Sequence, residues 1–360
     1  MLCLLAVTPV VALAQNMPSS TSLTFYGKID EAVDTVRFSS TATRDTQTAH
    51  YLSNDISFWG VRGVEDLGSG TRAYFKLEAG FNTDTGASSA PAQFFDRESY
   101  VGYGAPWGSI QLGSQYSPSL FVQARSDPFS RHSNGTGITL TQQIPGNLRG
   151  FLGATTQNNA IQYISPPMGG FTARVMYGLT ERVIEPKEVG RLEAVSLDYA
   201  KGPIFLGVAL EEQMLPTVPV GGSLSNRTLS AGGSYDFNIV KLYAYLTKNR
   251  LTYSNDVNTY LVGLNYPMGL STIKTTYAHR MLNDVDGGKT SMFAIGYYYD
   301  LSKRTTLYTS FAHLNNGAAT SFGIWPSDKT YAPPVVAGGS GLPVTGQNIS
   351  SFEFGVRHTF

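Results

Sequence analysis

Cysteine, charged residues and long apolar runs are all scarce in this sequence. Its one cysteine, Cys3, lies in an apolar N-terminal segment, so the rest of the chain can form neither a disulfide nor a cysteine-ligated metal site. No run of about 18 apolar residues follows that segment, which excludes a transmembrane helix. If the chain spans a membrane, it must therefore do so as a closed β-barrel.

Charge is balanced as well as sparse. Charged residues make up 14% of the sequence, and 26 lysine and arginine residues face 26 aspartate and glutamate residues. Because the formal net charge is zero and no basic cluster resembles a phosphate-tracking stripe, we do not expect nucleic-acid binding. The histidines lie outside any nucleophile or metal-binding motif, so we expect no enzyme, cofactor or metal. They are His50, His132, His279, His313 and His358.

What the sequence does contain favours strands and turns. It has 38 glycines and 21 tyrosines, and no linker or low-complexity tract divides it. Residues 1–14 are apolar and end in Ala12-Leu13-Ala14, the small-residue pattern of a signal-peptidase site. We expect a signal peptide over 1–14, truncated at its start because the usual positive segment is missing, and one barrel domain over 15–360. The alternative is an apolar N-terminal strand.

Segments of about ten residues alternate between apolar and polar positions, the length that a tilted strand needs to cross a bilayer. The clearest are residues 23–33, 72–80, 171–179 and 351–360. In each segment an apolar face opposes a face with charged side chains, such as Lys28, Arg72, Lys76, Arg174 and Arg357. A half-buried strand of a soluble sandwich would alternate in the same way.

The lengths of the connections between these segments say more about the fold class than the segments themselves. Seven short joins, such as 66–70 and 201–203, take turns with eight long polar stretches, the longest being 117–158 and 315–348. This sorting predicts an all-β, antiparallel transmembrane barrel of about sixteen strands, with both termini at the short-turn side. Barrels of about this size enclose water, which suits the charged faces.

Several segments resemble the Gram-negative general porins, particularly the trimeric type of the β-proteobacteria. The resemblance runs from about residue 22 to the C-terminus. It is carried by LTFYGK at 23–28, WGVRGVEDLG at 59–68, FKLEAGF at 75–81, DRESYVGYG at 96–104, LGSQY at 112–116 and GVRHTF at 355–360.

The resemblance implies a sixteen-stranded barrel, assembled as a homotrimer, whose third long loop folds into the lumen. That loop corresponds to the stretch 117–158, and a cluster of basic side chains is expected on the wall opposite it. The expected wall residues are Lys28, Arg62, Arg72, Lys76, Arg97 and Arg174. Lys28 and Arg97 match the family by position. Phe58 and Ser114 replace two arginines that are common in the family, and Arg72, Lys76 and Arg174 are expected to compensate in part.

The third long loop contributes its own charges to the expected constriction. Arg125, Arg131 and Arg149 outnumber one acid, Asp127, and His132 lies beside Arg131. Because a low-dielectric wall focuses the field of fixed charges, we hypothesise a weak preference for anions. The alternative for each arginine is a solvated loop charge or one tied to the loop's own backbone.

The sequence thus predicts a water-filled channel for passive diffusion of ions and small hydrophilic solutes across the outer membrane of a Gram-negative bacterium. Expected partners are two further copies in a homotrimer, outer-membrane lipid and lipopolysaccharide. A substrate-specific channel and a surface-binding barrel that works through its long loops remain open alternatives. An outer-membrane enzyme would need a histidine near an aspartate or serine at the rim.

Overall fold

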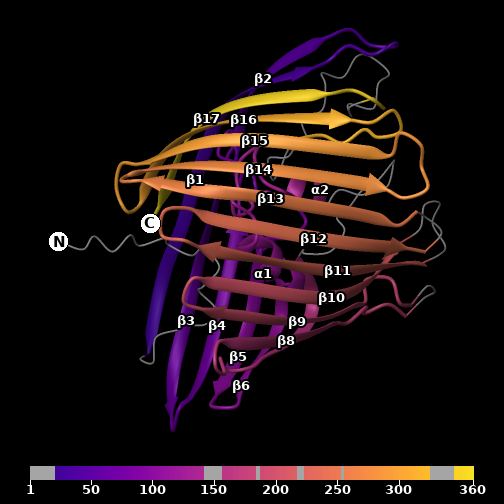
Figure 1. The fold of residues 1–360 in the computed structure, drawn as a ribbon. Coiled ribbons are helices and arrows are strands. Elements are labelled where there is room, and N and C mark those ends of the chain that lie inside the picture. Colours follow the sequence, from indigo (N-terminus) through magenta and orange to yellow (C-terminus); the bar gives the residue numbers. More distant parts are fainter. Residues whose placement is uncertain (1–20, 142–155, 184–186, 217–222, 253–254, 325–343) are drawn as a thin grey trace.

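The computed structural model describes residues 21–141, 156–183, 187–216, 223–252, 255–324 and 344–360. The expected signal peptide and Arg149 lie outside these residues, as do residues 325–343 of the last long stretch. The described strands form one antiparallel sheet that closes on itself into a barrel (Figure 1). Neither described helix is long and apolar enough to cross a membrane.

The strands and helices follow the chain in simple order. They are β1 (Ser22–Phe38), β2 (Gln47–Asn54), β3 (Phe58–Gly68), β4 (Thr71–Gly80), β5 (Glu98–Ala105), β6 (Gly108–Tyr116), α1 (Pro118–Arg125), α2 (Ile138–Thr141), β7 (Thr156–Ile164), β8 (Phe171–Gly178), β9 (Leu192–Lys201), β10 (Ile204–Pro216), β11 (Ser223–Asp236), β12 (Lys241–Leu251), β13 (Val257–Met268), β14 (Ser271–Leu282), β15 (Lys289–Asp300), β16 (Thr305–Asn316) and β17 (Ile349–Thr359).

β2 and β3 are two parts of one wall strand. Residues 31–38 of β1 pair with β2, and residues 22–28 pair with β3. Between these parts Ile56 has a φ of 58°, a left-handed conformation that interrupts the ladder. Because β17 pairs with the other edge of β1, the sheet has no free edge. The 17 described segments, with β2 and β3 counted together, confirm the predicted sixteen-stranded barrel.

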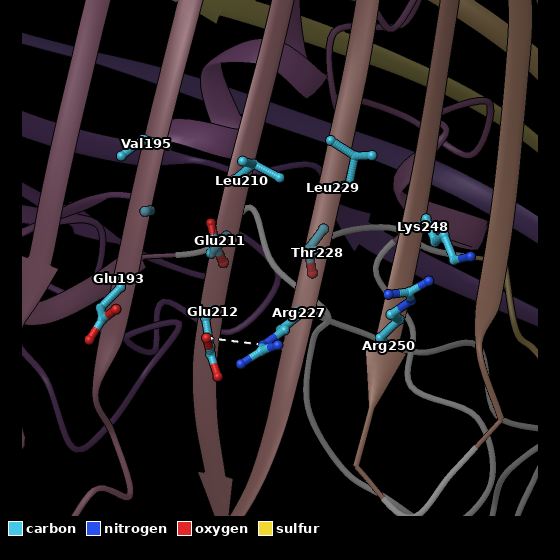
Figure 2. A pocket seen from close by; sticks show the side chains of 11 residues that line it. Glu193, Val195, Leu210, Glu211, Glu212, Arg227, Thr228, Leu229, Lys248 and Arg250 are labelled. Carbon is cyan, nitrogen blue, oxygen red and sulfur yellow. Dashed lines mark ion pairs between the residues drawn. The ribbon is translucent and has the colours of Figure 1, made fainter.

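Alternation along each strand sorts side chains between the two faces of the wall. On β1, Phe25 is 62% exposed and Ile29 is 43% exposed, whereas Lys28 and Asp30 between and beside them are buried toward the interior. Leu210 and Leu229 carry the same outward apolar face to β10 and β11 (Figure 2). An apolar outer surface with a polar interior is the arrangement that a bilayer-spanning barrel requires.

One expected loop is shorter in the structure. The long stretch predicted at 38–52 is cut back because β2 begins at Gln47 and pairs with β1. The segment QTAHYLSN contains mainly polar residues, so it lacks the apolar alternation that predicts a membrane-spanning strand. The two helices were not predicted either, and both lie within the third long loop.

Candidate functional site

The described part of the third long loop, residues 117–141, lies inside the barrel. Helix α1 packs against β8, β9, β10 and β11, and α2 packs against β13, β14 and β15 (Figure 1). On the far side, the backbone N–H of Asn134 donates to Glu353 of β17 at 3.2 Å. The Arg280 guanidinium of β14 donates to the Leu140 carbonyl at 2.8 Å. The loop thus crosses the lumen and contacts several parts of the wall.

The wall beside the loop carries an ion-pair network around Lys28. Its ammonium lies 3.3 Å from Asp30 Oδ2 and donates to the backbone carbonyl of Asp55 at 2.8 Å. The Nδ1 atom of His132, from the loop, is 3.1 Å away. Arg357 of β17 completes the network, with its Nε 2.6 Å from Asp30 Oδ2. Lys28 therefore faces the lumen, but carboxylates balance much of its charge.

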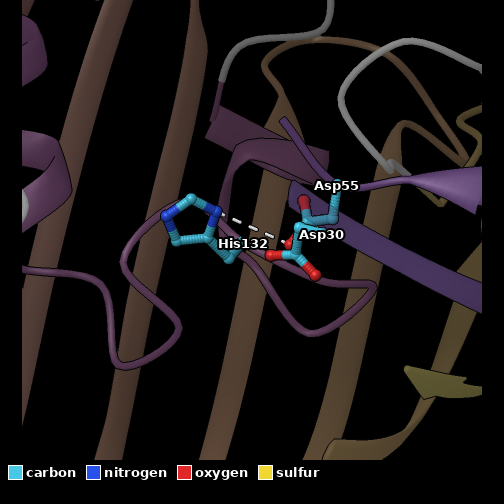
Figure 3. Close-up of side chains that lie close together, drawn as sticks. All are labelled: Asp30, Asp55 and His132. Atoms are coloured by element: carbon cyan, nitrogen blue, oxygen red, sulfur yellow. Dashed lines mark ion pairs between the residues drawn. The ribbon is translucent and has the colours of Figure 1, made fainter. Parts of the chain in front are cut away.

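Asp30, Asp55 and His132 also have the composition of a metal site, since their ligand atoms lie within 4.8 Å of one another (Figure 3). A metal ion there would meet two cations, because Lys28 contacts Asp30 and Arg357 reaches Asp30 and Asp55. Burial, together with the charges of Lys28 and Arg357, holds the pKa of His132 well below its usual value. This cluster is an ion-pair network around a neutral histidine.

A second network on the wall balances two more of the predicted cations. Lys76 lies 2.9 Å from Glu78 and also contacts Glu98. The Arg97 Nε is 3.3 Å from Glu78, and its guanidinium stacks 4.3 Å from the ring centroid of Phe58. Phe58 thus faces inward and supports Arg97 by a cation–π contact.

The other predicted wall residues face inward but lie in different surroundings. Arg174 is buried and ion-paired with Asp198 of β9. Arg62 lies 5.1 Å from the ring centroid of Tyr26. Arg72 is the second residue of β4, beside the short turn from β3. Arg174 and Lys76 are each ion-paired with a carboxylate, so they add less positive charge to the lumen than expected. They therefore compensate only in part for the two arginines that Phe58 and Ser114 replace.

The arginines of the loop differ from the paired wall cations in their contacts. Arg125, the last residue of α1, stacks 3.9 Å from the ring centroid of Phe205. Arg131 donates to the side-chain carbonyl of Gln123. Within the described residues, neither Arg125 nor Arg131 has a carboxylate ion-pair partner. Burial lowers the pKa of Arg131 to about 10, which leaves the guanidinium charged at neutral pH.

Asp127, the acid of this loop, accepts hydrogen bonds from the loop itself. Its carboxylate accepts hydrogen bonds from the backbone N–H groups of Phe129 at 3.0 Å, Arg131 at 3.1 Å and Gly137 at 3.2 Å, and from the Thr136 hydroxyl at 2.6 Å. Burial raises its pKa, and these donors oppose the rise. With only 1% of its surface exposed, Asp127 shapes the loop rather than the lumen surface.

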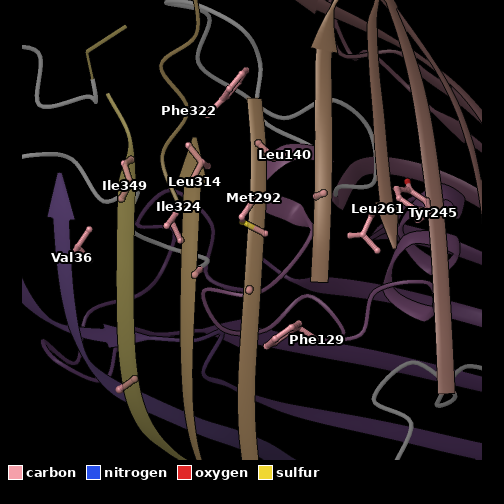
Figure 4. Packing of buried hydrophobic residues seen from close by; sticks show 14 of the residues in the cluster. Val36, Phe129, Leu140, Tyr245, Leu261, Met292, Leu314, Phe322, Ile324 and Ile349 are labelled. Carbon is pink, nitrogen blue, oxygen red and sulfur yellow. The ribbon is translucent and has the colours of Figure 1, made fainter. Parts of the chain in front are cut away.

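Apolar contacts fix the loop between these polar groups. Phe129 and Leu140 of the loop belong to one buried cluster with Met292, Leu314 and Ile349 of the wall (Figure 4). The Phe129 ring meets the Tyr298 ring edge-on at 6.2 Å between centroids. Burial of these side chains holds the loop inside the lumen, since apolar groups there would otherwise face water.

The sequence analysis did not identify several charged residues that contact the wall cations or the loop. Arg357 lies on a predicted inward face and within the GVRHTF motif but was not assigned to the wall cluster, and Arg280 lies on a strand for which no alternation was predicted. Asp55 lies in the break between β2 and β3, where alternation gives no direction. A search for acids two residues from each wall cation would have found Asp30 and Glu78.

Comparison with known proteins decides the family. A sequence profile described as Gram-negative porin matches residues 2–319. The chain belongs to the Gram-negative porin family. This porin is 30% identical to outer membrane porin protein 32 of Delftia acidovorans over 360 residues, which covers 98% of this chain and 97% of that protein. It is 26% identical to an outer membrane porin of Bordetella pertussis, with 89% and 97% covered.

Solved structures agree with the fold. An anion-selective porin from Comamonas acidovorans superposes with a TM-score of 0.80 at 28% identity, covering 95% of this porin and 100% of that chain. The trimer form of OmpT from Vibrio cholerae gives a TM-score of 0.65 at 13% identity and shows a similar fold. This porin is thus an outer-membrane barrel that forms a channel for passive diffusion, and porins act as channels rather than enzymes.

Proposed function

We propose that this porin passes small anions in preference to cations. The observation that carries the proposal is how charge is distributed across the lumen. Lys28, Lys76 and Arg97 on the wall each lie beside a carboxylate, whereas Arg125 and Arg131 on the loop have no such partner among the described residues. Asp127 is buried against the loop's own backbone, whereas Arg125 and Arg131 are partly exposed, so the charges that the described loop offers to a passing solute are cationic.

Physical reasoning favours cations without a carboxylate partner as the source of selectivity, and Arg125 and Arg131 of the loop are two of them. The field of a close ion pair falls off faster with distance than that of a single charge. Single charges act over about 8 Å at physiological salt, and a low-dielectric wall strengthens their field. The similar porin from Comamonas acidovorans is described as anion-selective, which supports the same sign here.

The test is the reversal potential of the refolded porin in a planar bilayer under a potassium chloride gradient. Potassium and chloride have nearly equal mobilities, so the sign reports the channel's preference. We expect stepwise currents with an anion-leaning reversal potential. A cation-leaning potential would contradict the anion preference and leave the channel in place, whereas a folded sample without current would contradict an open channel.

We also propose that three copies assemble through the outer surface of β1 and β3. Phe25, Trp59, Phe94 and Phe360 form an outward aromatic group, with Phe25 6.0 Å from Trp59 and 5.7 Å from Phe360. Phe94 is 68% exposed and lies 6.2 Å from Trp59. Light scattering of the detergent-solubilised protein should give three chains per particle, and Phe94→Ser should lower that number. A monomeric wild-type protein would contradict the proposal.

A further inference from the structure

A polar cavity lies at the end of the barrel where the short turns and the C-terminus are found (Figure 1). It has a volume of about 670 Å³ and is lined by the last residue of α1 and by the short-turn ends of β9, β10, β11 and β12. Helix α1 packs against three of these strands from inside the lumen. Because the short turns of outer-membrane barrels face the periplasm, the cavity lies at the periplasmic mouth of the channel.

Three cations line this cavity. They are Arg125 of α1, Lys201 at the end of β9 and Lys241 at the start of β12. Within the described residues, none of the three has a carboxylate at ion-pair distance, and the charges of Arg125 and Lys241 repel each other. Asp236, at the end of β11, is the one carboxylate in the described lining. Three cations against one carboxylate leave an excess of two positive charges.

The Arg125 guanidinium is placed to bind an anion. It stacks 3.9 Å from the ring centroid of Phe205, and this contact holds the group in position. Its N–H groups donate to no other residue in the described part of the chain. A guanidinium that stacks on a ring keeps its N–H groups directed outward in its own plane, where they bind phosphate or carboxylate oxygens in pairs.

The rest of the lining suits hydroxyl groups. Oδ1 of Asp236 accepts the backbone N–H of Asn238 at 2.8 Å, whereas Oδ2 accepts no hydrogen bond from a described residue. Ser234 and Asn238 add further polar groups to the lining. A carboxylate oxygen can only accept, so a ligand group beside Asp236 must donate a hydrogen bond. A matching ligand therefore has both an anionic group and hydroxyl groups.

We propose that this cavity binds phosphorylated sugars as they leave the channel. A phosphate monoester carries a charge of about −1.5 to −2 at pH 7, which matches the excess of two positive charges. The phosphate group lies against Arg125 and Lys241, and the sugar hydroxyls lie against Asp236 and Ser234. The inference rests on the proposed anion preference, because the ligand must pass the loop arginines, and it adds a class of solute.

The test measures how much glucose 6-phosphate is needed to block half of the ion current through the refolded porin in a planar bilayer. The cavity variant Asp236→Asn/Lys241→Gln removes one charge of each sign, so the net charge of the pore stays the same. Lys248→Gln/Asp256→Asn is the matched control, because it removes one charge of each sign from an ion pair at the long-loop end of β12. We expect the cavity variant to need about a tenfold higher concentration for half-block, and the control to match the wild type.

Two further readings separate this site from the anion preference. Stepwise currents show that each variant folds into a channel. The reversal potential of the cavity variant should equal that of the wild type, because its net charge is unchanged. A cation-leaning potential in the wild type would contradict the anion preference, whereas the half-block concentrations test the cavity itself.

Three results would overturn the proposal. Glucose could block the wild type at the same concentration as glucose 6-phosphate, which would show that the phosphate is not recognised. Inorganic phosphate could block it at that same concentration, which would show that the sugar hydroxyls are not recognised. The cavity variant could keep the half-block concentration of the wild type, which would place the binding elsewhere in the lumen.

Discussion

The ammonium of Lys28 lies 3.1 Å from Nδ1 of His132 and so connects the first strand to the loop inside the lumen. A lysine ammonium can only donate, so Nδ1 accepts and the imidazole carries its one proton on Nε2. Asp55 Oδ2 lies 3.5 Å from the same Nδ1, and Asp30, Arg357 and Lys274 are further charged groups that act on the ring. Burial and the neighbouring cations therefore favour a neutral histidine in the docked loop.

Loop docking should weaken as the pH falls. A histidine in a detached loop has a pKa of about 6.5, and the docked His132 has a lower one, so protonation below about pH 6.5 favours detachment. The melting temperature of wild type should fall further between pH 7 and pH 5 than that of His132→Asn. His50→Asn, at an exposed position, is the control. A parallel fall in wild type and His132→Asn would refute the role of His132.

Arg280 should hold α2 of the loop in place. It is 1% exposed, donates to the Leu140 carbonyl and stacks 4.5 Å from the ring centroid of Phe322. Losing a hydrogen bond from a charged donor costs about 1.5–3 kcal/mol. Arg280→Leu should therefore raise open-channel current noise, and Arg280→Lys, which keeps the charge, should have a smaller effect. Quiet currents in Arg280→Leu would show that other contacts suffice.

Phe129 should stabilise the docked loop mainly through apolar packing. It is 1% exposed and lies in the apolar cluster between loop and wall. Truncating a buried phenylalanine to alanine costs about 3–5 kcal/mol. Phe129→Ala should increase hydrogen exchange in residues 127–137, measured by mass spectrometry. Phe171→Ala, which removes an exposed aromatic of β8, is the control, and equal exchange in both variants would contradict the packing role.

The sequence predicted the barrel well because its strands and loops follow simple physical rules. Alternation gave the inward position of Lys28, and the sorting of loops by length gave the strand number. β2 was not predicted because its mainly polar residues do not show the apolar alternation of a membrane-facing strand. The two helices of the loop were not predicted because the loop's conformation depends on its contacts with the wall.

The constriction was predictable in position but not in charge. Alternation shows that Lys76 faces the lumen, but not that Glu98 of β5 lies against it. Such pairs depend on register between neighbouring strands, which a single sequence does not contain. Asp127 likewise counts as a loop acid in the sequence, whereas the structure turns it toward the loop's backbone.

The most direct test of selectivity compares reversal potentials of two double variants with wild type under the same salt gradient. Arg125→Gln/Arg131→Gln removes two loop charges that have no carboxylate partner in the described structure. Lys76→Gln/Glu98→Gln removes one charge of each sign from a wall pair. We predict that the loop variant loses at least half of the wild-type reversal potential and that the wall variant retains most of it. An unchanged loop variant, or a larger shift in the wall variant, would contradict control of selectivity by the loop arginines.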